Sequence, residues 1–179
     1  MDLETPRLQI KAIDLETAQV LMKNALAFYY KYQLPWSEDW PHDGLRALLP
    51  LYAEQVEADE TSVGFGPWFI IDKHHQRIIG DIGFKGRPDQ EGAVEIGYCI
   101  VPEERGAGYA SEAVEYIVQW AFQNGAKSVQ AQCDRENIPS QKVLINNRFV
   151  NTDKQDKILL FKREKKVHDH YKERSKRGL

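Results

Sequence analysis

Residues 94–124 constrain the fold of this chain more than any other stretch. They read, in order, as a strand, a short Arg-Gly-Ala-Gly turn at 105–108, and an apolar run with helical spacing that ends before Gly125. Gly106 and Gly108 lack a Cβ atom, so the backbone can curl there and point successive N–H groups inward, where a helix N-terminus adds partial positive charge. The stretch therefore predicts an anion site that suits a phosphate-bearing ligand.

The turn also carries a family pattern. Arg105-x-x-Gly108-x-Ala110, placed after a strand with Glu95-Ile96-Gly97-Tyr98, resembles the acetyl-CoA pyrophosphate loop of the GNAT acetyltransferase superfamily. Further segments follow in the order seen in the branch that contains the ribosomal-protein (Rim-type) N-acetyltransferases: Thr5-Pro6-Arg7-Leu8, Gly80-Asp81-Ile82-Gly83-Phe84, and Asn137-Ile138-Pro139-Ser140 with Val143-Leu144. The resemblance covers roughly residues 3–163. It implies a mixed α+β, GNAT-like fold, in which a mostly antiparallel central sheet with one parallel, splayed pair of strands lies in a three-layer α/β/α arrangement.

The hydrophobic pattern predicts the same kind of sheet. Expected strands are 7–13, 67–72, 77–85, 93–101 and 127–134, followed by a hairpin of 149–151 and 157–163. Expected helices are one capped by Asp14 that runs through Phe28, one over 43–58, one from Ala110 to Gly125, and one capped by Asn137 that ends near Asn147. Because the strand at 127–134 follows a helix, it is expected to lie parallel to the strand before it.

Length and composition predict one domain. A chain of 179 residues with 42% hydrophobic content suffices for one core but not comfortably for two, so we assign 1–163 to a single acetyltransferase domain and 164–179 to a basic C-terminal tail. The N-terminus Met-Asp-Leu-Glu lacks the basic start of a secretory signal, and no apolar run approaches the roughly 20 residues that span a bilayer. We therefore expect a cytoplasmic protein. Cys99 and Cys133 lie in expected strands and are predicted to be free thiols.

Charge is uneven along the chain. Residues 162–179 hold eight Lys or Arg against three acids, although the formal net charge of the whole chain is −3. Such a tail can contact nucleic acid or a ribosome, or it can simply be solvated. The acidic remainder argues against a general nucleic-acid surface. The sequence leaves a monomer and a homodimer both open.

Other functional classes fit the glycine turn poorly. A dinucleotide-binding fingerprint needs a third glycine where Ser111 stands, and too little chain follows Asp134 for further parallel units. No Gly-Lys-Ser/Thr follows the glycines, which argues against a nucleoside triphosphate loop. The five histidines show no metal-ligand spacing, so no metal is expected. No serine or cysteine sits in a nucleophile elbow, which favours direct transfer without an acyl-enzyme.

Acetyl transfer from a thioester to an amine needs a group that takes the amine's proton. Glu95 is the candidate, because it lies on the strand that leads to the loop and shares a face with Gly97 and Cys99. A solvated or salt-bridged glutamate at the start of a strand is the alternative.

The resemblance implies the remaining roles. Backbone N–H groups of Ile100 and Val101, freed where the parallel strands splay, would face the acetyl oxygen, and Asn137 would both cap its helix and hold the pantetheine arm. Cofactor contacts are expected from the whole turn: Arg105, Gly106, Ala107, Gly108, Tyr109 and Ala110. The tyrosine general acid of many family members is missing, because Leu144 stands at its position, so Ser140 becomes the candidate donor at the CoA sulfur.

Two local features complete the expectations from the family pattern. The usual Leu-Gly-Phe after the last helix reads Asn147-Arg148-Phe149, and Asn147 is expected to take the left-handed stop. In the family, the aromatic-rich stretch 29–41 roofs the acceptor site, although its rings also suit simple packing of the first helices.

Together these features predict an acetyl-CoA-dependent N-acetyltransferase that moves an acetyl group to a primary amine in a ternary complex. The acceptor is open: a peptide N-terminus, a small polyamine or an antibiotic amine. A GNAT-like protein that binds acyl-CoA without transfer is the alternative, and a factor that binds RNA through residues 162–179 is a third hypothesis.

Overall fold

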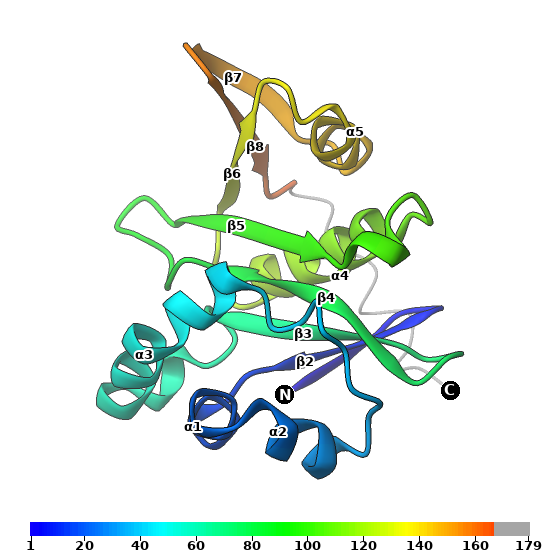
Figure 1. The fold of residues 1–179 in the computed structure, drawn as a ribbon. Helices are drawn as coiled ribbons and strands as arrows, with labels where there is room; N and C mark the ends of the chain where they lie inside the picture. Colours follow the sequence, from blue (N-terminus) through cyan, green and yellow to red (C-terminus); the bar gives the residue numbers. More distant parts are fainter. Residues whose placement is uncertain (167–179) are drawn as a thin grey trace, which may run out of the picture.

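One sheet with helices on both faces organises the protein (Figure 1). The computed structural model describes residues 1–166. The strands in this part are β1 (Asp2–Glu4), β2 (Leu8–Ala12), β3 (Pro67–Asp72), β4 (Arg77–Phe84), β5 (Ala93–Ile100), β6 (Ser128–Asp134), β7 (Val150–Gln155) and β8 (Ile158–Glu164). They follow the order β1-β2-β3-β4-β5-β6-β8-β7, and among these pairs only β5 and β6 run parallel. The predicted mixed sheet with one parallel pair is confirmed.

Two helical layers cover this sheet. The helices in the described part are α1 (Leu15–Lys23), α2 (Ala25–Tyr32), α3 (Asp43–Ala58), α4 (Tyr109–Gln123) and α5 (Ile138–Asn146), with 3₁₀ turns η1 (Glu60–Ser62) and η2 (Pro102–Glu104). Helices α4 and α5 contribute to one core cluster, and α1, α2 and α3 to the other. The result is the predicted three-layer α/β/α arrangement.

Strand β3 shows why both faces must be covered. All six of its residues are buried. Trp68 and Ile70 pack in the cluster with α4, whereas Phe69 and Ile71 pack in the cluster with α1–α3. A strand that is apolar on both faces is stable only between two layers, because period-two alternation otherwise exposes every second side chain to water.

Strands β5 and β6 separate part-way along their length. They pair only from Ala93 to Ile96 on β5, opposite Ser128 to Ala131 on β6. Beyond that point both strands continue without pairing to each other, and Figure 1 shows them diverging. This splay opens the sheet at the end of β5 that leads to α4, where the glycine turn lies.

The structure corrects several expected boundaries. The three-residue strand β1 was missed, because so short a segment carries no usable alternation. The helix expected through Phe28 is two helices, since Asn24 ends α1 and its side chain accepts the Leu26 N–H to cap α2. The first strand of the closing hairpin, expected to stop at Asn151, extends to Gln155.

The stop of α5 is also different from the prediction. Asn147 does not take the left-handed conformation (φ −91°, ψ 20°), and Arg148 takes it instead (φ 64°). Asn147 is buried, and its amide donates to Ser111 and to the Val143 carbonyl, so it joins α5 to the first turn of α4. The tertiary hydrogen bonds to Ser111 outweigh the local preference of asparagine for the left-handed region.

Candidate active site

The turn at 105–108 and the start of α4 form the candidate phosphate site, which we call the cradle. Gly106 and Gly108 both have φ 81°, which other residues adopt only with strain. Gly108 is the N-cap of α4 and provides no side-chain cap. The other helices of the described part each have a capping side chain: Asp14, Asn24, His42 and Asn137. The first N–H groups of α4 thus have no side-chain cap, which suits a phosphate at the positive end of the helix dipole.

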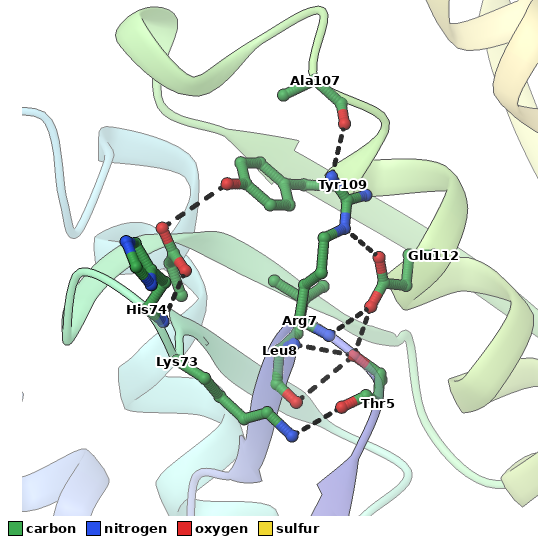
Figure 2. Close-up of polar contacts among 9 residues, drawn as sticks. Thr5, Arg7, Leu8, Lys73, His74, Ala107, Tyr109 and Glu112 are labelled. Atoms are coloured by element: carbon green, nitrogen blue, oxygen red, sulfur yellow. Dashed lines mark hydrogen bonds and ion pairs between the residues drawn. The ribbon is translucent and has the colours of Figure 1, made fainter.

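Arg7 ties this turn to the N-terminal strands (Figure 2). Its Nη1 donates to the Ala107 carbonyl at 2.8 Å, and its Nε donates to Glu112 Oε2 at 2.6 Å. The guanidinium also lies 4.5 Å from the centre of the Tyr109 ring. Arg7 therefore contacts the turn, the first residue of α4 and a residue one turn into that helix.

Glu112 is the anchor for this contact. It accepts hydrogen bonds from the Thr5 hydroxyl at 2.6 Å and from the Arg7 backbone N–H at 2.9 Å (Figure 2). Burial opposes its charge, but the bonds from Thr5 and Arg7 outweigh burial and hold the pKa of Glu112 below its ordinary value. The Thr5-Pro6-Arg7-Leu8 segment thus holds the glycine turn in place.

A cavity of about 560 Å³ lies beside the turn, and we call it the donor cavity. The side of the turn contributes Arg105, Gly106, Gly108, Tyr109 and Ala110, and facing residues include Tyr98, Cys99, Ile100, Asn137 and Ser140. Arg105 Nε donates to the Ile100 carbonyl at 2.8 Å, which fixes the turn against the end of β5. Asn137 Oδ1 accepts the Ser140 N–H at 3.2 Å and caps α5, as predicted.

Two hydroxyl groups meet in the donor cavity. The Tyr98 hydroxyl lies 2.8 Å from Ser140 Oγ, with β5 providing the tyrosine and α5 the serine. Burial raises the pKa of Tyr98 to about 12. Leu144, at the position where many members of the resembled family have a tyrosine, is buried in the core. A tyrosine hydroxyl therefore reaches this region from the strand instead of from the helix.

The backbone at the end of β5 divides its hydrogen bonds between two sides. The Val101 N–H donates to the Ile79 carbonyl at 2.9 Å, toward β4. Alternation along a strand then directs the N–H groups of Ile100 and Tyr98 toward the splay. Val101 therefore does not offer the freed N–H group that was expected of it, and Tyr98 joins Ile100 as a backbone donor facing the splay.

A second cavity, of about 200 Å³, lies on the α3 side of β5, and we call it the acceptor cavity. Its lining includes His42, Asp81 and Lys85, and it shares Tyr98 and Cys99 with the donor cavity. Burial, and then the nearby Asp81 carboxylate, raise the pKa of the Cys99 thiol. The two cavities thus meet at β5, at the start of the splay.

Glu95 lies outside the lining of both cavities. Its Oε1 forms an ion pair with Lys85, and its Oε2 lies 3.5 Å from Gln132 Nε2. The predicted shared face with Gly97 and Cys99 follows from the alternation of β5, but Glu95 sits before the splay begins.

Comparisons with known proteins agree with this geometry. The family model described as Acetyltransferase (GNAT) domain matches residues 7–150. The chain belongs to the GNAT acetyltransferase family. YjdG, an uncharacterized N-acetyltransferase of Bacillus subtilis, is 30% identical over 149 residues, which cover 83% of this chain and 89% of YjdG.

Solved structures show the same GNAT fold. The ribosomal-protein-S5-alanine acetyltransferase from Vibrio fischeri matches with TM-score 0.66 at 20% identity, over 92% of this chain and 96% of that one. The Microcin C7 self-immunity acetyltransferase MccE, solved with acetyl-CoA and AMP, matches with TM-score 0.61 at 14% identity, over 89% and 93% of the two chains.

Most residues expected to bind the GNAT cofactor come together. Those that line the donor cavity are Ile100, Arg105, Gly106, Gly108, Tyr109, Ala110, Asn137 and Ser140. Ala107 lies in the turn, where its carbonyl accepts a hydrogen bond from Arg7. The Val101 N–H points toward β4. Sequence reasoning gave no role to the side chains of Tyr98, Asp81 and His42, whereas Trp40 lies in the stretch 29–41 that was expected to roof the acceptor site. Of these, Tyr98 and Asp81 lie inside quoted motifs, so the motifs marked the right strands without marking the side chains.

The structure also bears on the cysteines, on membrane and metal features, and on the extent of the described tail. Cys133 is buried and Cys99 half-buried, and both are free thiols. Within residues 1–166, no helix is long and apolar enough to cross a bilayer, and no group of three His, Cys, Asp or Glu side chains gathers that could hold a metal ion. Residues 167–179, most of the predicted basic tail, lie outside the described residues.

Proposed function

We propose that this GNAT acetyltransferase transfers the acetyl group of acetyl-CoA to a primary amine by direct attack in a ternary complex. The observation that carries the proposal is the meeting of two cavities at β5. The donor cavity lies beside the phosphate cradle, the acceptor cavity opens on the α3 side, and both are lined by Tyr98 and Cys99. Two substrates held on the two sides of β5 would meet without a covalent enzyme intermediate.

The donor cavity fits acetyl-CoA, which would supply an activated acetyl thioester. The positive φ of Gly106 and Gly108 and the uncapped start of α4 suit the pyrophosphate. Asn137 is proposed to hold the pantetheine arm, because it lines the cavity at the exposed start of α5. The Ile100 N–H faces the splay, where it would stabilise the acetyl oxygen as that oxygen gains charge.

Tyr98 and Ser140 are proposed to act on the sulfur as hydrogen-bond donors. A thiol has a pKa of about 8.5, well below the value of about 12 for Tyr98. Full transfer of the tyrosine proton to a thiolate is therefore uphill, and an aliphatic hydroxyl such as that of Ser140 is weaker still as an acid. The pair can stabilise the leaving thiolate by hydrogen bonding while water provides the final proton.

The role of Glu95 in accepting the proton of the amine stays a prediction. Its ion pair with Lys85 and its place outside both cavities weaken the case for direct contact, so a role through bound water is the form that we propose.

The acceptor is proposed to be a peptide N-terminus or a small amine. The Vibrio fischeri neighbour is a ribosomal-protein alanine acetyltransferase, so peptides belong in the screen beside polyamines and aminoglycosides. Calorimetry with acetyl-CoA comes first, and the absence of saturable binding would refute the proposal. Mass shifts of the amines in the panel and release of free thiol then distinguish acetyl transfer from binding alone. Turnover with any primary amine excludes the alternative of a protein that binds acyl-CoA without transfer.

A further inference from the structure

Asp81 is a buried carboxylate fixed in the wall of the acceptor cavity. It lies on β4, is 8% exposed, and stands in register with Cys99 on β5. Trp40 Nε1 donates to its Oδ2 at 2.9 Å, and His42 Nε2 lies close to both of its oxygens, 3.1 Å from Oδ2 and 3.2 Å from Oδ1. Trp40 is itself 1% exposed, so this side of the carboxylate is held rigidly by the segment that precedes α3.

Both donors to Asp81 are neutral in this geometry. His42 Nδ1 accepts the backbone N–H groups of Gly44 and Leu45 at 3.1 and 3.4 Å and so caps α3. A nitrogen that accepts these bonds carries no proton, so the proton lies on Nε2, which donates to Asp81. The hydrogen bond with Asp81 raises the pKa of His42. Protonation at Nδ1 would, however, break the two cap bonds to Gly44 and Leu45.

Within residues 1–166, no Lys or Arg forms an ion pair with Asp81, so neutral His42 leaves its negative charge without a fixed cation. Lys85, which lines the same cavity, is paired with Glu95, and Arg46 donates its Nε to the Pro41 carbonyl. A buried carboxylate is costly unless an opposite charge compensates it. The acceptor cavity supplies the space for such a charge beside Asp81.

We propose that Asp81 is the anionic subsite of the acceptor cavity and binds the positively charged amine of the acceptor next to Cys99. This inference rests on the proposed function and specifies its acceptor class as a cationic amine. Alkyl amines arrive mostly protonated near neutral pH. After the amine has lost a proton, its nitrogen becomes positive again as it attacks, so the same carboxylate stabilises both the bound cation and the reacting nitrogen.

The Trp40 indole N–H reports on this subsite directly, because it donates to Asp81. We would record indole signals of ¹⁵N-labelled protein saturated with CoA, and assign Trp40 with Trp40→Phe. Trp68, whose indole donates to the Gly64 carbonyl at 2.8 Å, serves as the internal reference. The probes are alaninamide and putrescine, and lactamide is the neutral control that carries a hydroxyl in place of the ammonium group.

We expect both cations to shift the Trp40 signal saturably, while lactamide and the Trp68 signal show no such change. Asp81→Asn should abolish the response. Asp43→Asn should keep it, since this control removes an exposed carboxylate next to His42 that does not line the cavity. Failure of both cations to move Trp40 in the wild type, or an unchanged response in folded Asp81→Asn, would overturn the subsite. The comparison of alaninamide with lactamide needs no variant, so it decides the matter even where Asp81→Asn does not fold.

Kinetics separate this inference from the proposed function. With an acceptor from the screen, Asp81→Asn should lower kcat/KM for the amine at least about 10-fold, as expected for a lost charged hydrogen bond, with unchanged acetyl-CoA affinity. Unchanged kcat/KM for the amine would overturn the subsite even if transfer is established. If no amine is acetylated, transfer fails, and the Trp40 signal still decides whether Asp81 binds cations.

Discussion

Replacing Arg7 by alanine tests whether the glycine turn is held in place before acetyl-CoA binds. Arg7 gives two side-chain hydrogen bonds, to the Ala107 carbonyl and to Glu112. Its side chain is 45% exposed and that of Glu112 is 14% exposed. A hydrogen bond to a charged group contributes about 1.5–3 kcal/mol, and an exposed ion pair contributes about 0–1 kcal/mol. For this half-exposed contact we expect about 1–2 kcal/mol, between those two limits.

This energy acts on the conformation of the turn. If the turn without Arg7 is in its binding conformation only part of the time, the apparent Kd rises by the inverse of that fraction. A loss of about 1–2 kcal/mol corresponds to roughly a 5- to 30-fold weaker Kd. Loss of the contacts between Arg7 and the start of α4 also predicts faster amide exchange at Ala107 and Gly108 in the free Arg7→Ala protein.

Calorimetry with CoA measures the first effect, and hydrogen exchange of the free protein measures the second. Lys11→Ala is the matched control, because it removes a β2 cation whose partner is Asp2 and not the turn. Arg7→Lys keeps the charge but not the two-pronged geometry, so it should recover only part of the affinity. A folded Arg7→Ala protein that binds CoA within about twofold of the wild type, with unchanged exchange at the turn, would refute the reasoning.

Three further predictions follow from the site. Gly108→Val should weaken CoA binding at least about 10-fold in a folded protein, because a branched residue resists φ 81°, and wild-type affinity by calorimetry would contradict the cradle. If Glu95 is a general base, Glu95→Gln should lower turnover about 10²- to 10⁴-fold at pH 7, and the loss should be smaller at higher pH. A loss within about threefold would mean that Glu95 has only a structural role, through its ion pair with Lys85. The pKa of Glu112 is lower in the folded protein than in the unfolded chain, where it is about 4.3. The ionised carboxylate therefore stabilises the fold at pH values above about 4.3, and this stabilisation is lost as the pH falls through the folded pKa. Urea midpoints of wild type and Glu112→Gln should therefore differ at pH 7 and converge in acid, and a pH-independent difference would show that the charge contributes nothing.

The donor half of the site could be predicted from sequence because it is local. Strand, turn and helix start lie within one continuous stretch, and the positive φ of Gly106 and Gly108 is the conformation for which glycine is the preferred residue. Asn137 was recognisable for the same reason, since a cap signal is read from neighbouring residues.

The acceptor half could not be predicted in this way because its parts are distant in sequence. Trp40 and Asp81 are 41 residues apart, and their hydrogen bond depends on how α3 packs on the sheet. Alternation placed Glu95 on the same face of β5 as Gly97 and Cys99 but said nothing of its position along the strand. The splay starts only after Ile96, so Glu95 lies before it. A period-two pattern identifies a face, whereas depth along the strand is set by pairing with neighbouring strands.

In the proposed function, strand β5 lies between the two substrates, so the effects of variants on each substrate can be measured separately. Even-numbered residues such as Tyr98 and Ile100 lie against the α4 core, while Gly97 lines the acceptor cavity. Within residues 1–166, no strand pairs with the β6-facing edge of β5 beyond Ile96, so the backbone there faces the splay. Changes to the acceptor side, such as Asp81→Asn on neighbouring β4, should therefore act on the amine, while changes to the glycine turn should act on the thioester substrate. A variant on one side that altered affinity for the opposite substrate alone would mean that the cavities do not divide the substrates as proposed.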